Sequence, residues 1–305
     1  MFVIAAPGQG SQKPGFLEPW LSDSVHADTL RRWSDTAGID LVTHGTVSDE
    51  ATIKDTAVAQ PLIVAAGILT GRALLASLPE GTPVAFAGHS VGEFTAAALS
   101  GVLSDEDALE LVALRGRAMA EASQLIDTGM AAVLGGNAET LEADVASRGL
   151  HPANFNGGGQ LVVAGTQELL DGLAESPIPG TRVIPLAVAG AFHTEFMESA
   201  QGRLADAAQA LTPHDPSYPL YTNRDGSLLS RGQDALDSLV HQVTRPVRWD
   251  SCMESFASDG IRGMMELAPA GALVGLAKRG LKGVPTVAMN TPDNLPQALE
   301  MVASA

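Results

Sequence analysis

A serine in a glycine-rich pentapeptide is the first residue of this sequence that could do chemistry. Ser90 lies in GHSVG, at positions 88–92, which fits the pattern G-x-S-x-G. A strand-like apolar run, 84–87, precedes it, and a helix-prone segment, 93–99, follows it. Such a turn lifts the serine hydroxyl out of the fold, and the unpaired N–H groups of the helix start can stabilise an oxyanion. The context favours a nucleophile, and a chance match in a glycine-rich chain is the alternative.

A nucleophilic serine needs a base, and His193 differs in its surroundings from the other histidines. It lies in the small-residue run AGAFHT, at positions 189–194, which leads from a strand into a helical segment. His89 adjoins the serine and is expected to support the turn, whereas His214 and His241 lie in polar stretches typical of a surface. Spacing alone favours a hydrogen-bonded core residue over a base at His193.

Arg115 is the third such residue, because it lies on the apolar side of an expected helix. The helix begins after Ser104, and Arg115 is four residues from both Leu111 and Met119 of the apolar stripe. Arg117 lies instead on the acidic, solvated face. A cation on a core-facing stripe is costly unless it meets an anion. An internal carboxylate and a substrate carboxylate are equally good partners on this pattern.

These residues need a scaffold that brings distant segments together. Short apolar runs alternate with helical segments, which is typical of a parallel α/β sheet. Residues 2–6 are expected to form the first strand, residues 59–78 a buried helix and residues 283–289 the last strand. We therefore expect an α/β-hydrolase-like body with a parallel sheet, made by residues 1–127 and 189–305.

The middle of the chain has a different order of elements. Residues 128–188 give strand, helix, strand, strand, helix, strand, which is the βαββαβ pattern of ferredoxin-like folds. We predict a small ferredoxin-like subdomain there, inserted into the larger body. Its strands are expected at 130–134, 151–156, 160–164 and 181–188, and its helices at 139–147 and 167–175.

The composition is that of an ordinary globular protein with an acidic surface. The 305 residues are 45% hydrophobic and 17% charged, and 18 Lys and Arg stand against 35 Asp and Glu, a formal net charge of −17. An acidic surface excludes a general binder of nucleic acid. The single cysteine, Cys252, excludes an internal disulfide and a zinc site built on cysteines. No metal site is expected.

The sequence predicts a soluble, cytoplasmic protein with no membrane partner. The apolar start of the chain has no basic residue before Lys13, unlike a signal peptide. The longest apolar span that we identify, residues 62–69, is shorter than the ~18 residues needed to cross a bilayer.

Six short motifs resemble those of malonyl-CoA:acyl-carrier-protein transacylases, the discrete acyltransferases of type II fatty-acid synthesis. The motifs are PGQGSQ at 7–12, GHSVGE at 88–93, RG at 115–116 with Met119, NFN at 154–156, AFH at 191–193 and RPVRW at 245–249. Together they cover nearly the whole chain in the family's order. The resemblance implies ping-pong transfer for fatty-acid or polyketide chain extension. Malonyl-CoA would acylate Ser90, and the phosphopantetheine thiol of acyl carrier protein would then take the malonyl group.

The resemblance also implies a role for each site residue. Ser90 would attack the thioester, and His193 would accept its proton. The backbone N–H groups of Gln9 and Val91 would form the oxyanion hole. Arg115 would pair with the free malonyl carboxylate, which decides between the two partners left open above.

Three further residues receive roles in the same way. The backbone carbonyl of Arg248 would orient His193, in place of the carboxylate of a triad. Phe192 would crowd an extra methyl group on the acyl α-carbon, a preference of about 1–3 kcal/mol, although plain core packing is the alternative. Asn156 would contact the substrate. No cofactor is implied, because the partner protein carries the phosphopantetheine.

Acyl carrier proteins are acidic, so this acidic chain would need a local cationic face to bind one. Lys278, Arg279 and Lys282 form the densest basic cluster, and Arg182 and Arg245 are further candidates. The cluster could equally complement the dipole at a helix end. The resemblance also implies a monomer.

Two other functions fit parts of the same pattern. A serine esterase or thioesterase also uses G-x-S-x-G, but those enzymes place an acidic residue between the serine and a late histidine. They also have no need of Arg115, because their esters are neutral. A catalytically idle module that binds carrier protein would have lost Ser90 or His193, and both are present.

Overall fold

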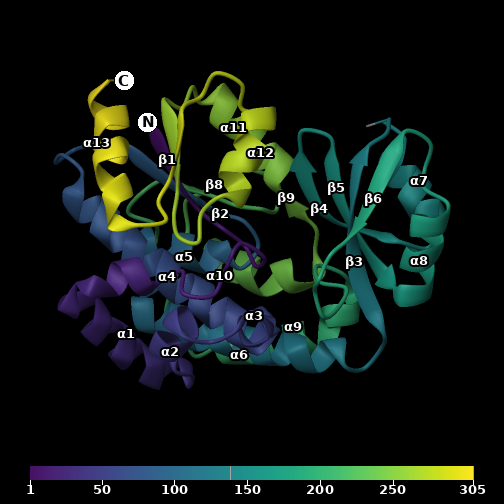
Figure 1. Cartoon of the computed structure of the whole chain (residues 1–305), viewed down its shortest axis with the longest axis horizontal. Helices are drawn as coiled ribbons and strands as arrows, with labels where there is room; N and C mark the ends of the chain where they lie inside the picture. Colours follow the sequence, from purple (N-terminus) through teal and green to yellow (C-terminus); the bar gives the residue numbers. More distant parts are fainter. Residues whose placement is uncertain (138, 305) are drawn as a thin grey trace.

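Two β-sheets organise the chain, each with its own helices (Figure 1). The computed structural model describes residues 1–137 and 139–304. Ala138, inside the predicted 128–188 unit, and Ala305, at the end of the predicted larger body, lie outside the described residues. The fold is a mixed α/β fold, as the sequence predicts.

Helices and strands alternate along most of the chain. Up to residue 123 they are β1 (Phe2–Ala6), α1 (Ser24–Ala37), α2 (Leu41–Thr46), α3 (Glu50–Lys54), α4 (Thr56–Ser77), β2 (Val84–Gly88), α5 (Gly92–Leu99) and α6 (Asp105–Ser123). The middle holds β3 (Thr128–Gly135), α7 (Leu141–Ser147), β4 (His151–Gly157), β5 (Gln160–Thr166), α8 (Gln167–Glu175) and β6 (Thr181–Pro185). The remainder holds α9 (Glu198–Ala208), β7 (Leu220–Tyr221), β8 (Leu228–Leu229), α10 (Gly232–His241), β9 (Val247–Arg248), α11 (Trp249–Ser258), β10 (Gly263–Glu266), α12 (Ala272–Gly280), β11 (Thr286–Ala288) and α13 (Leu295–Ala303). Short 3-10 helices also occur at η1 (Glu18–Ser22), η2 (Glu195–Met197), η3 (Gln242–Thr244) and η4 (Pro292–Asn294).

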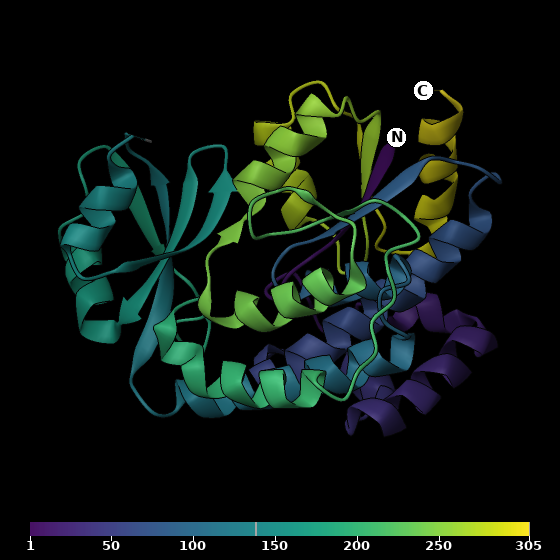
Figure 2. The same ribbon diagram turned by 180° about the vertical axis from the view of Figure 1, so that it is seen from behind.

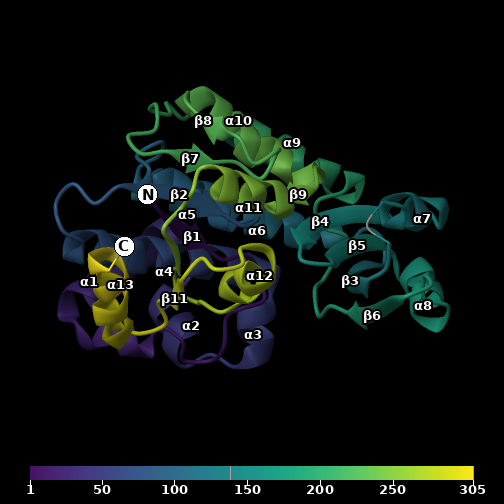
Figure 3. The same ribbon diagram turned by 90° about the horizontal axis from the view of Figure 1, so that it is seen from above.

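The larger sheet has the strand order β11-β10-β1-β2-β7-β8 and is parallel except between β7 and β8. Side chains of β1 alternate between its two faces. Phe2, Ile4 and Ala6 belong to the core formed with α4, α5 and α6, and Val3 and Ala5 belong to the core formed with α11 and α12. Both faces are buried, as is typical of parallel sheets. Seen from above, α9 and α10 lie on one side of the molecule and α1 and α2 on the other, with β1 and β2 between them (Figure 3).

The buried helix predicted at 59–78 is α4, which Asp55 caps by accepting a hydrogen bond from the Ala57 amide. By length and composition α4 could cross a membrane, so the expectation of no apolar span longer than 62–69 is wrong. The helix continues beyond position 69, and Thr70, Gly71 and Leu74 are still buried there. Of its most apolar window, 78% is buried, as in the core helix of a soluble protein.

Helix α6 packs closely on α4 because Gly116 lies at the crossing. A Cβ atom at Gly116 would lie 2.9 Å from the carbonyl oxygen of Thr56. Ser104 caps the start of α6, as the sequence predicts. The predicted stripe is also confirmed, since Arg115 is buried and Arg117 is exposed.

The smaller sheet has the strand order β6-β3-β5-β4-β9. Its neighbours are antiparallel except β4 and β9, and its elements follow the predicted order β3-α7-β4-β5-α8-β6. The strand β9 comes from outside the predicted 128–188 unit and pairs with Asn154 and Phe155 of β4. The last predicted strand of this unit ends early, at Pro185. Helices α7 and α8 lie on the side away from the larger sheet (Figure 2).

The helices α1, α2 and α3 were not identified from the sequence. Asp23, Asp40 and Asp49 cap their starts by accepting backbone hydrogen bonds. Just before α1, the indole N–H of Trp20 donates to the carbonyl of Asn290 at 2.9 Å. This bond ties the start of the chain to the segment that follows β11.

Candidate active site

The strand-to-helix turn at Ser90 requires glycine on both sides. A Cβ atom at Gly88 would lie 2.0 Å from the carbonyl carbon of Gly92, and one at Gly92 would lie 2.3 Å from the carbonyl oxygen of Ala6. Ser90 itself has a φ of 53°. A residue other than glycine costs about 1–3 kcal/mol in that region. The turn is therefore a strained element that the surrounding sheet holds in place.

Ser90 and His193 form a hydrogen-bonded pair. Ser90 Oγ lies 2.7 Å from His193 Nε2, and His193 Nδ1 lies 2.8 Å from the backbone carbonyl of Gln242. Because a carbonyl only accepts, Nδ1 carries the hydrogen, and Nε2 of the neutral ring accepts from the serine hydroxyl. His193 has a φ of 63°, and no other non-glycine residue described besides Ser90 has a positive φ.

The carbonyl that orients His193 belongs to Gln242, so the prediction of Arg248 is wrong. The chain turns through η3 directly after α10, and that turn places the carbonyl at residue 242 against the ring. Arg248 lies six residues further on, in β9 of the smaller sheet. Its guanidinium donates to Asp250 at 2.9 Å and lies 4.7 Å from the ring centre of Phe155.

The environment keeps His193 neutral. Burial and then the positive charge of Arg115 lower the pKa of His193 to about 3. The imidazole is therefore unprotonated at neutral pH and can accept a proton. A neutral imidazole in contact with a hydroxyl is the arrangement that general-base chemistry requires.

Asn223 holds the turn from the end of a neighbouring strand. Its Oδ1 accepts from the Ser90 amide at 2.7 Å, and its Nδ2 donates to the Gly88 carbonyl at 2.6 Å. Asn223 lies just beyond β7, which is parallel to β2, so the two strand ends meet at one edge of the sheet. Asn223 was not among the predicted site residues, although a polar residue close to a strand end is a usable signal.

Arg115 is buried, and two glutamine side chains hold its guanidinium. Its Nη1 donates to Gln60 at 2.6 Å and its Nη2 to the Oε1 of Gln242 at 3.0 Å. Within the described residues its buried Nε has no partner, and Arg115 forms no ion pair. Burial lowers the pKa of Arg115 to about 9, against the opposing effect of Glu93, so the side chain stays cationic at neutral pH.

Glu93 and Gln242 connect Arg115 with the pair. The Nε2 of Gln242 donates to the Ser90 carbonyl at 3.0 Å and also to Glu93 Oε2. Glu93 Oε1 accepts from the backbone N–H of Asn223 at 2.6 Å. Burial raises the pKa of Glu93 to about 7, although hydrogen bonds and the charge of Arg115 oppose the shift. Neither Glu93 nor Gln242 was among the predicted site residues.

The pair opens into a cleft of about 350 Å³ between the two sheets. Of the predicted site residues, Gln9, Asn156 and Phe192 also line it. The Oδ1 of Asn156 accepts from the ring of His89 at 2.8 Å. His89 thus supports the turn by linking it to the smaller sheet, as its place in the sequence predicts.

The backbone amides of Gln9 and Val91 lie at the loops beside the serine. The loop after β1 is close to the turn, because a Cβ atom at Gly8 would lie 3.7 Å from the Cβ of Ser90. Throughout residues 1–137 and 139–304, neither amide hydrogen of Gln9 or Val91 has an acceptor. Free N–H groups beside a nucleophile are what an oxyanion hole requires.

The basic cluster lies at the end of α12, beside the cleft. Lys278 and Arg279 are in the last turn of the helix, and Lys282 follows it. All three side chains are exposed, and of the three only Arg279 also lines the cleft. The structure thus places one residue of the cluster at the cleft.

The other candidate chemistry lies away from this cleft or is inert. In the part of the chain that the structure describes, no three His, Cys, Asp or Glu side chains are grouped to hold a metal ion. Cys252 is buried, and its Sγ donates to the carbonyl of Thr222 at 3.3 Å. Burial raises the pKa of its thiol, which keeps it protonated and unreactive.

The sequence matches an acyl transferase domain model over residues 1–299. It is 45% identical over 296 residues to the malonyl CoA-acyl carrier protein transacylase of Mycobacterium tuberculosis, covering 97% of this chain and 98% of that protein. The protein of the same name from Escherichia coli K12 is 31% identical over 307 residues, covering 98% of this chain and 99% of its own.

Solved structures give the same result. The crystal structure of MCAT from Mycobacterium tuberculosis superposes with a TM-score of 0.95 at 45% identity, covering 98% of this chain and 99% of the other. A malonyl-transacylase solved in complex with its type II PKS acyl-carrier protein gives a TM-score of 0.91 at 29% identity, covering 98% and 99%. Since the family model and these relatives match almost the full length, the chain belongs to the acyl transferase domain family.

Proposed function

We propose that this chain transfers the malonyl group of malonyl-CoA to the phosphopantetheine thiol of an acyl carrier protein, for fatty-acid or polyketide chain extension. The observation that carries the proposal is the 2.7 Å contact between Ser90 Oγ and His193 Nε2 beside the cleft. The names of the curated relatives support malonyl-CoA as the donor, and the solved complex supports a carrier protein as the acceptor. No cofactor belongs to the proposal, and the enzyme would act as a cytoplasmic monomer.

In the first half-reaction, Ser90 Oγ attacks the thioester carbonyl while His193 Nε2 takes the hydroxyl proton. The carbonyl of Gln242 holds Nδ1–H and stabilises the imidazolium that forms. The oxyanion of the tetrahedral intermediate accepts from the amides of Gln9 and Val91. As the carbon–sulfur bond breaks, His193 returns the proton to the sulfur, and CoA leaves a malonyl-serine ester behind.

The second half-reaction runs the same steps with a different thiol. The phosphopantetheine thiol gives its proton to His193, and its sulfur attacks the malonyl-serine carbonyl. The same two amides stabilise the second oxyanion. Ser90 Oγ then leaves and recovers the proton, which frees the enzyme for another malonyl-CoA.

Arg115 would bind the malonyl carboxylate. Two of its five guanidinium N–H groups are used by Gln60 and Gln242, which leaves three, including the buried Nε–H. A carboxylate that accepted two of these would pair a buried cation that has no ion-pair partner in the described chain. Phe192 and Asn156, in the cleft wall, would contact the rest of the acyl group.

The proposal divides the fold at the cleft. Residues 1–127 and 189–305 would form the α/β-hydrolase-like body, and residues 128–188 the inserted ferredoxin-like subdomain. The parallel order of the larger sheet and the antiparallel order β6-β3-β5-β4 support this division. The substrate would then bind between the two units.

The malonyl-serine intermediate gives the direct test. Mass spectrometry after brief exposure to malonyl-CoA should find a malonyl adduct on Ser90 and none on Ser90→Ala. Unmodified wild-type protein would favour the idle carrier-binding module. Fast release of free malonate without carrier protein would favour the esterase.

Carrier-protein docking is tested separately. We propose that Lys278, Arg279 and Lys282 contact the acidic carrier protein. Lys278→Glu and Arg279→Glu should slow transfer to carrier protein while hydrolysis of the malonyl-enzyme stays unchanged. The matched control is Arg32→Glu, because Arg32 is exposed on α1 and does not line the cleft. Unchanged transfer in both cluster variants would leave the helix dipole as the reason for these charges.

A further inference from the structure

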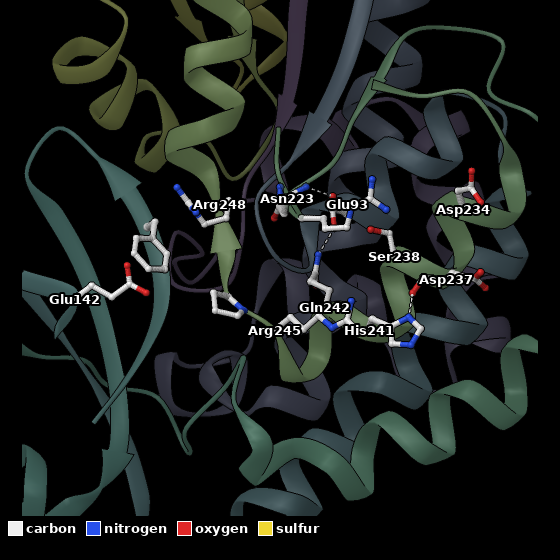
Figure 4. A pocket seen from close by; sticks show the side chains of 13 residues that line it. Glu93, Glu142, Asn223, Asp234, Asp237, Ser238, His241, Gln242, Arg245 and Arg248 are labelled. Carbon is white, nitrogen blue, oxygen red and sulfur yellow. Dashed lines mark hydrogen bonds between the residues drawn. The ribbon is translucent and has the colours of Figure 1, made fainter. Parts of the chain in front are cut away.

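A second cavity reaches the residues that hold the Ser90 turn and Arg115. It measures about 390 Å³, and its lining has no residue in common with the lining of the cleft. Glu93, Asn223 and Gln242 line it, and Figure 4 shows these three side chains meeting at its centre. Glu93 therefore belongs to a buried hydrogen-bond network with its own opening.

Both oxygens of Glu93 are held by N–H donors. The backbone N–H of Asn223 donates to Oε1 at 2.6 Å, and the side-chain Nε2 of Gln242 donates to Oε2. An ionised carboxylate has acceptors only, so it satisfies both donors at once. A protonated carboxyl group, or a glutamine, would turn a hydrogen toward one of them.

The same contact fixes which way the Gln242 amide faces. Its two N–H hydrogens go to the Ser90 carbonyl and to Glu93, so its Oε1 is left to accept from Arg115. If the carboxylate were lost, the amide could turn and present N–H groups to the guanidinium, which also has only donors. Arg115 would then lose one of the two acceptors that hold it.

We propose that Glu93 is a positioning residue for the transfer reaction, which acts through Gln242 on Arg115 and through Asn223 on the Ser90 turn. Both oxygens of Glu93 already accept hydrogen bonds, and an ionised carboxylate has no donor for the malonyl carboxylate, so Glu93 acts without touching the substrate. The inference rests on the proposed function, because its readout is the preference for a malonyl over an acetyl group. The geometry assigns the Arg115 clamp a dependence on an ionised carboxylate that lies outside the cleft.

The charges around Glu93 set the pH range of this dependence. Arg115 on α6 favours the ionised form, whereas Cys252 on α11 carries a protonated thiol and His193 a neutral ring. The remaining titratable side chains of the cavity are Glu142, Arg224, Asp234, Asp237, His241, Arg245 and Arg248. Burial raises the pKa of Glu93 to about 7, so the ionised form is lost as the pH falls through neutrality. His193 titrates far lower and therefore does not produce an acid limb near neutral pH, and loss of the limb in a Glu93 variant would assign it to Glu93.

The test is Glu93→Gln, which keeps the shape but cannot accept from both donors. We expect kcat/KM for malonyl transfer to fall about 10- to 100-fold, mainly through a higher KM for malonyl-CoA, while acetyl transfer falls far less. The acid limb of the wild-type malonyl profile near neutral pH should disappear in the variant. Glu142→Gln is the matched control, because Glu142 lines the same cavity, is exposed and makes no bond to the network. It should keep wild-type kinetics.

The results that contradict the Glu93 inference differ from the result that contradicts the proposed function. Glu93→Gln with the wild-type preference and an unchanged acid limb would overturn the inference. If the variant does not fold, the pH dependence of the malonyl-to-acetyl ratio of the wild-type enzyme tests the inference instead. A malonyl-to-acetyl ratio that stays flat from about pH 6 to about pH 8 would overturn it, and a ratio that rises with pH would support it. Wild-type enzyme that transfers no malonyl at any pH would refute the proposed function itself.

Discussion

Replacing Arg115 by alanine removes the cation on which the proposed malonyl clamp depends. A carboxylate held by two guanidinium N–H groups gains two charge-assisted hydrogen bonds, each worth about 1.5–3 kcal/mol. Their loss amounts to about 3–6 kcal/mol, so kcat/KM for malonyl transfer should fall by about 10²–10⁴-fold. Three free N–H groups on Arg115 allow this geometry.

Acetyl transfer provides the internal reference for the same variant. An acetyl group has no carboxylate, so Arg115→Ala should change its transfer only through the loosened Gln60 and Gln242 side chains. The assay compares transfer from malonyl-, methylmalonyl- and acetyl-CoA to carrier protein. Arg117→Ala, exposed on the same helix, is the matched control and should behave as wild type. Equal losses for malonyl and acetyl would refute the clamp.

Three further predictions concern the turn, the base and the cleft wall. Gly88→Ala should destabilise the protein by several kcal/mol in thermal unfolding, because its Cβ would lie 2.0 Å from the Gly92 carbonyl carbon. Gly172→Ala is the control and should be harmless, because its Cβ would have no heavy atom within 4 Å. His193 should lower the free energy of unfolding by up to about 1.4 kcal/mol per pH unit as the pH drops from 6.5 towards about 3, because the unfolded state binds a proton that buried His193 does not. Glu93, whose pKa is raised to about 7, opposes this slope above about pH 4.5, so the measurement is the difference between wild type and His193→Asn. Equal slopes for the two proteins would contradict the assignment. Phe192→Ser should shift the malonyl-to-methylmalonyl preference by about 1–3 kcal/mol, and an unaltered ratio would leave Phe192 as core packing.

Local patterns in the sequence predicted the elements that carry the chemistry. The pentapeptide around Ser90 was predicted to lie between a strand and a helix, and β2 and α5 are there. The apolar stripe of α6 placed Arg115 on a buried face, and the order of the middle elements is the predicted one. Each of these features depends on residues close in sequence, so periodicity and turn residues report them.

The residues behind the pair escaped prediction because their roles depend on distant segments. Gln242 bonds residues 90, 93, 115 and 193, and no local pattern marks a glutamine in a short loop for that role. The family resemblance implies the carbonyl of Arg248 as the orienting group. Since every residue has a carbonyl, only the path of the chain shows that the one of Gln242 faces His193. Helices α1 to α3 escaped for another reason, since their start signals are single Asp residues.

The central place of β1 affects how the chain can fold during synthesis. Phe2 to Ala5 pair with Gly263 to Glu266, so the first strand to be synthesised cannot pair with β10 until most of the chain has been made. Until β10 emerges from the ribosome, one edge of β1 is unpaired, and open apolar edges favour aggregation. Pairing across so long a separation also slows folding. Helix α12, which forms part of the cleft wall, follows β10, so a chain cut short before residue 263 would lack both a finished sheet and a closed substrate site.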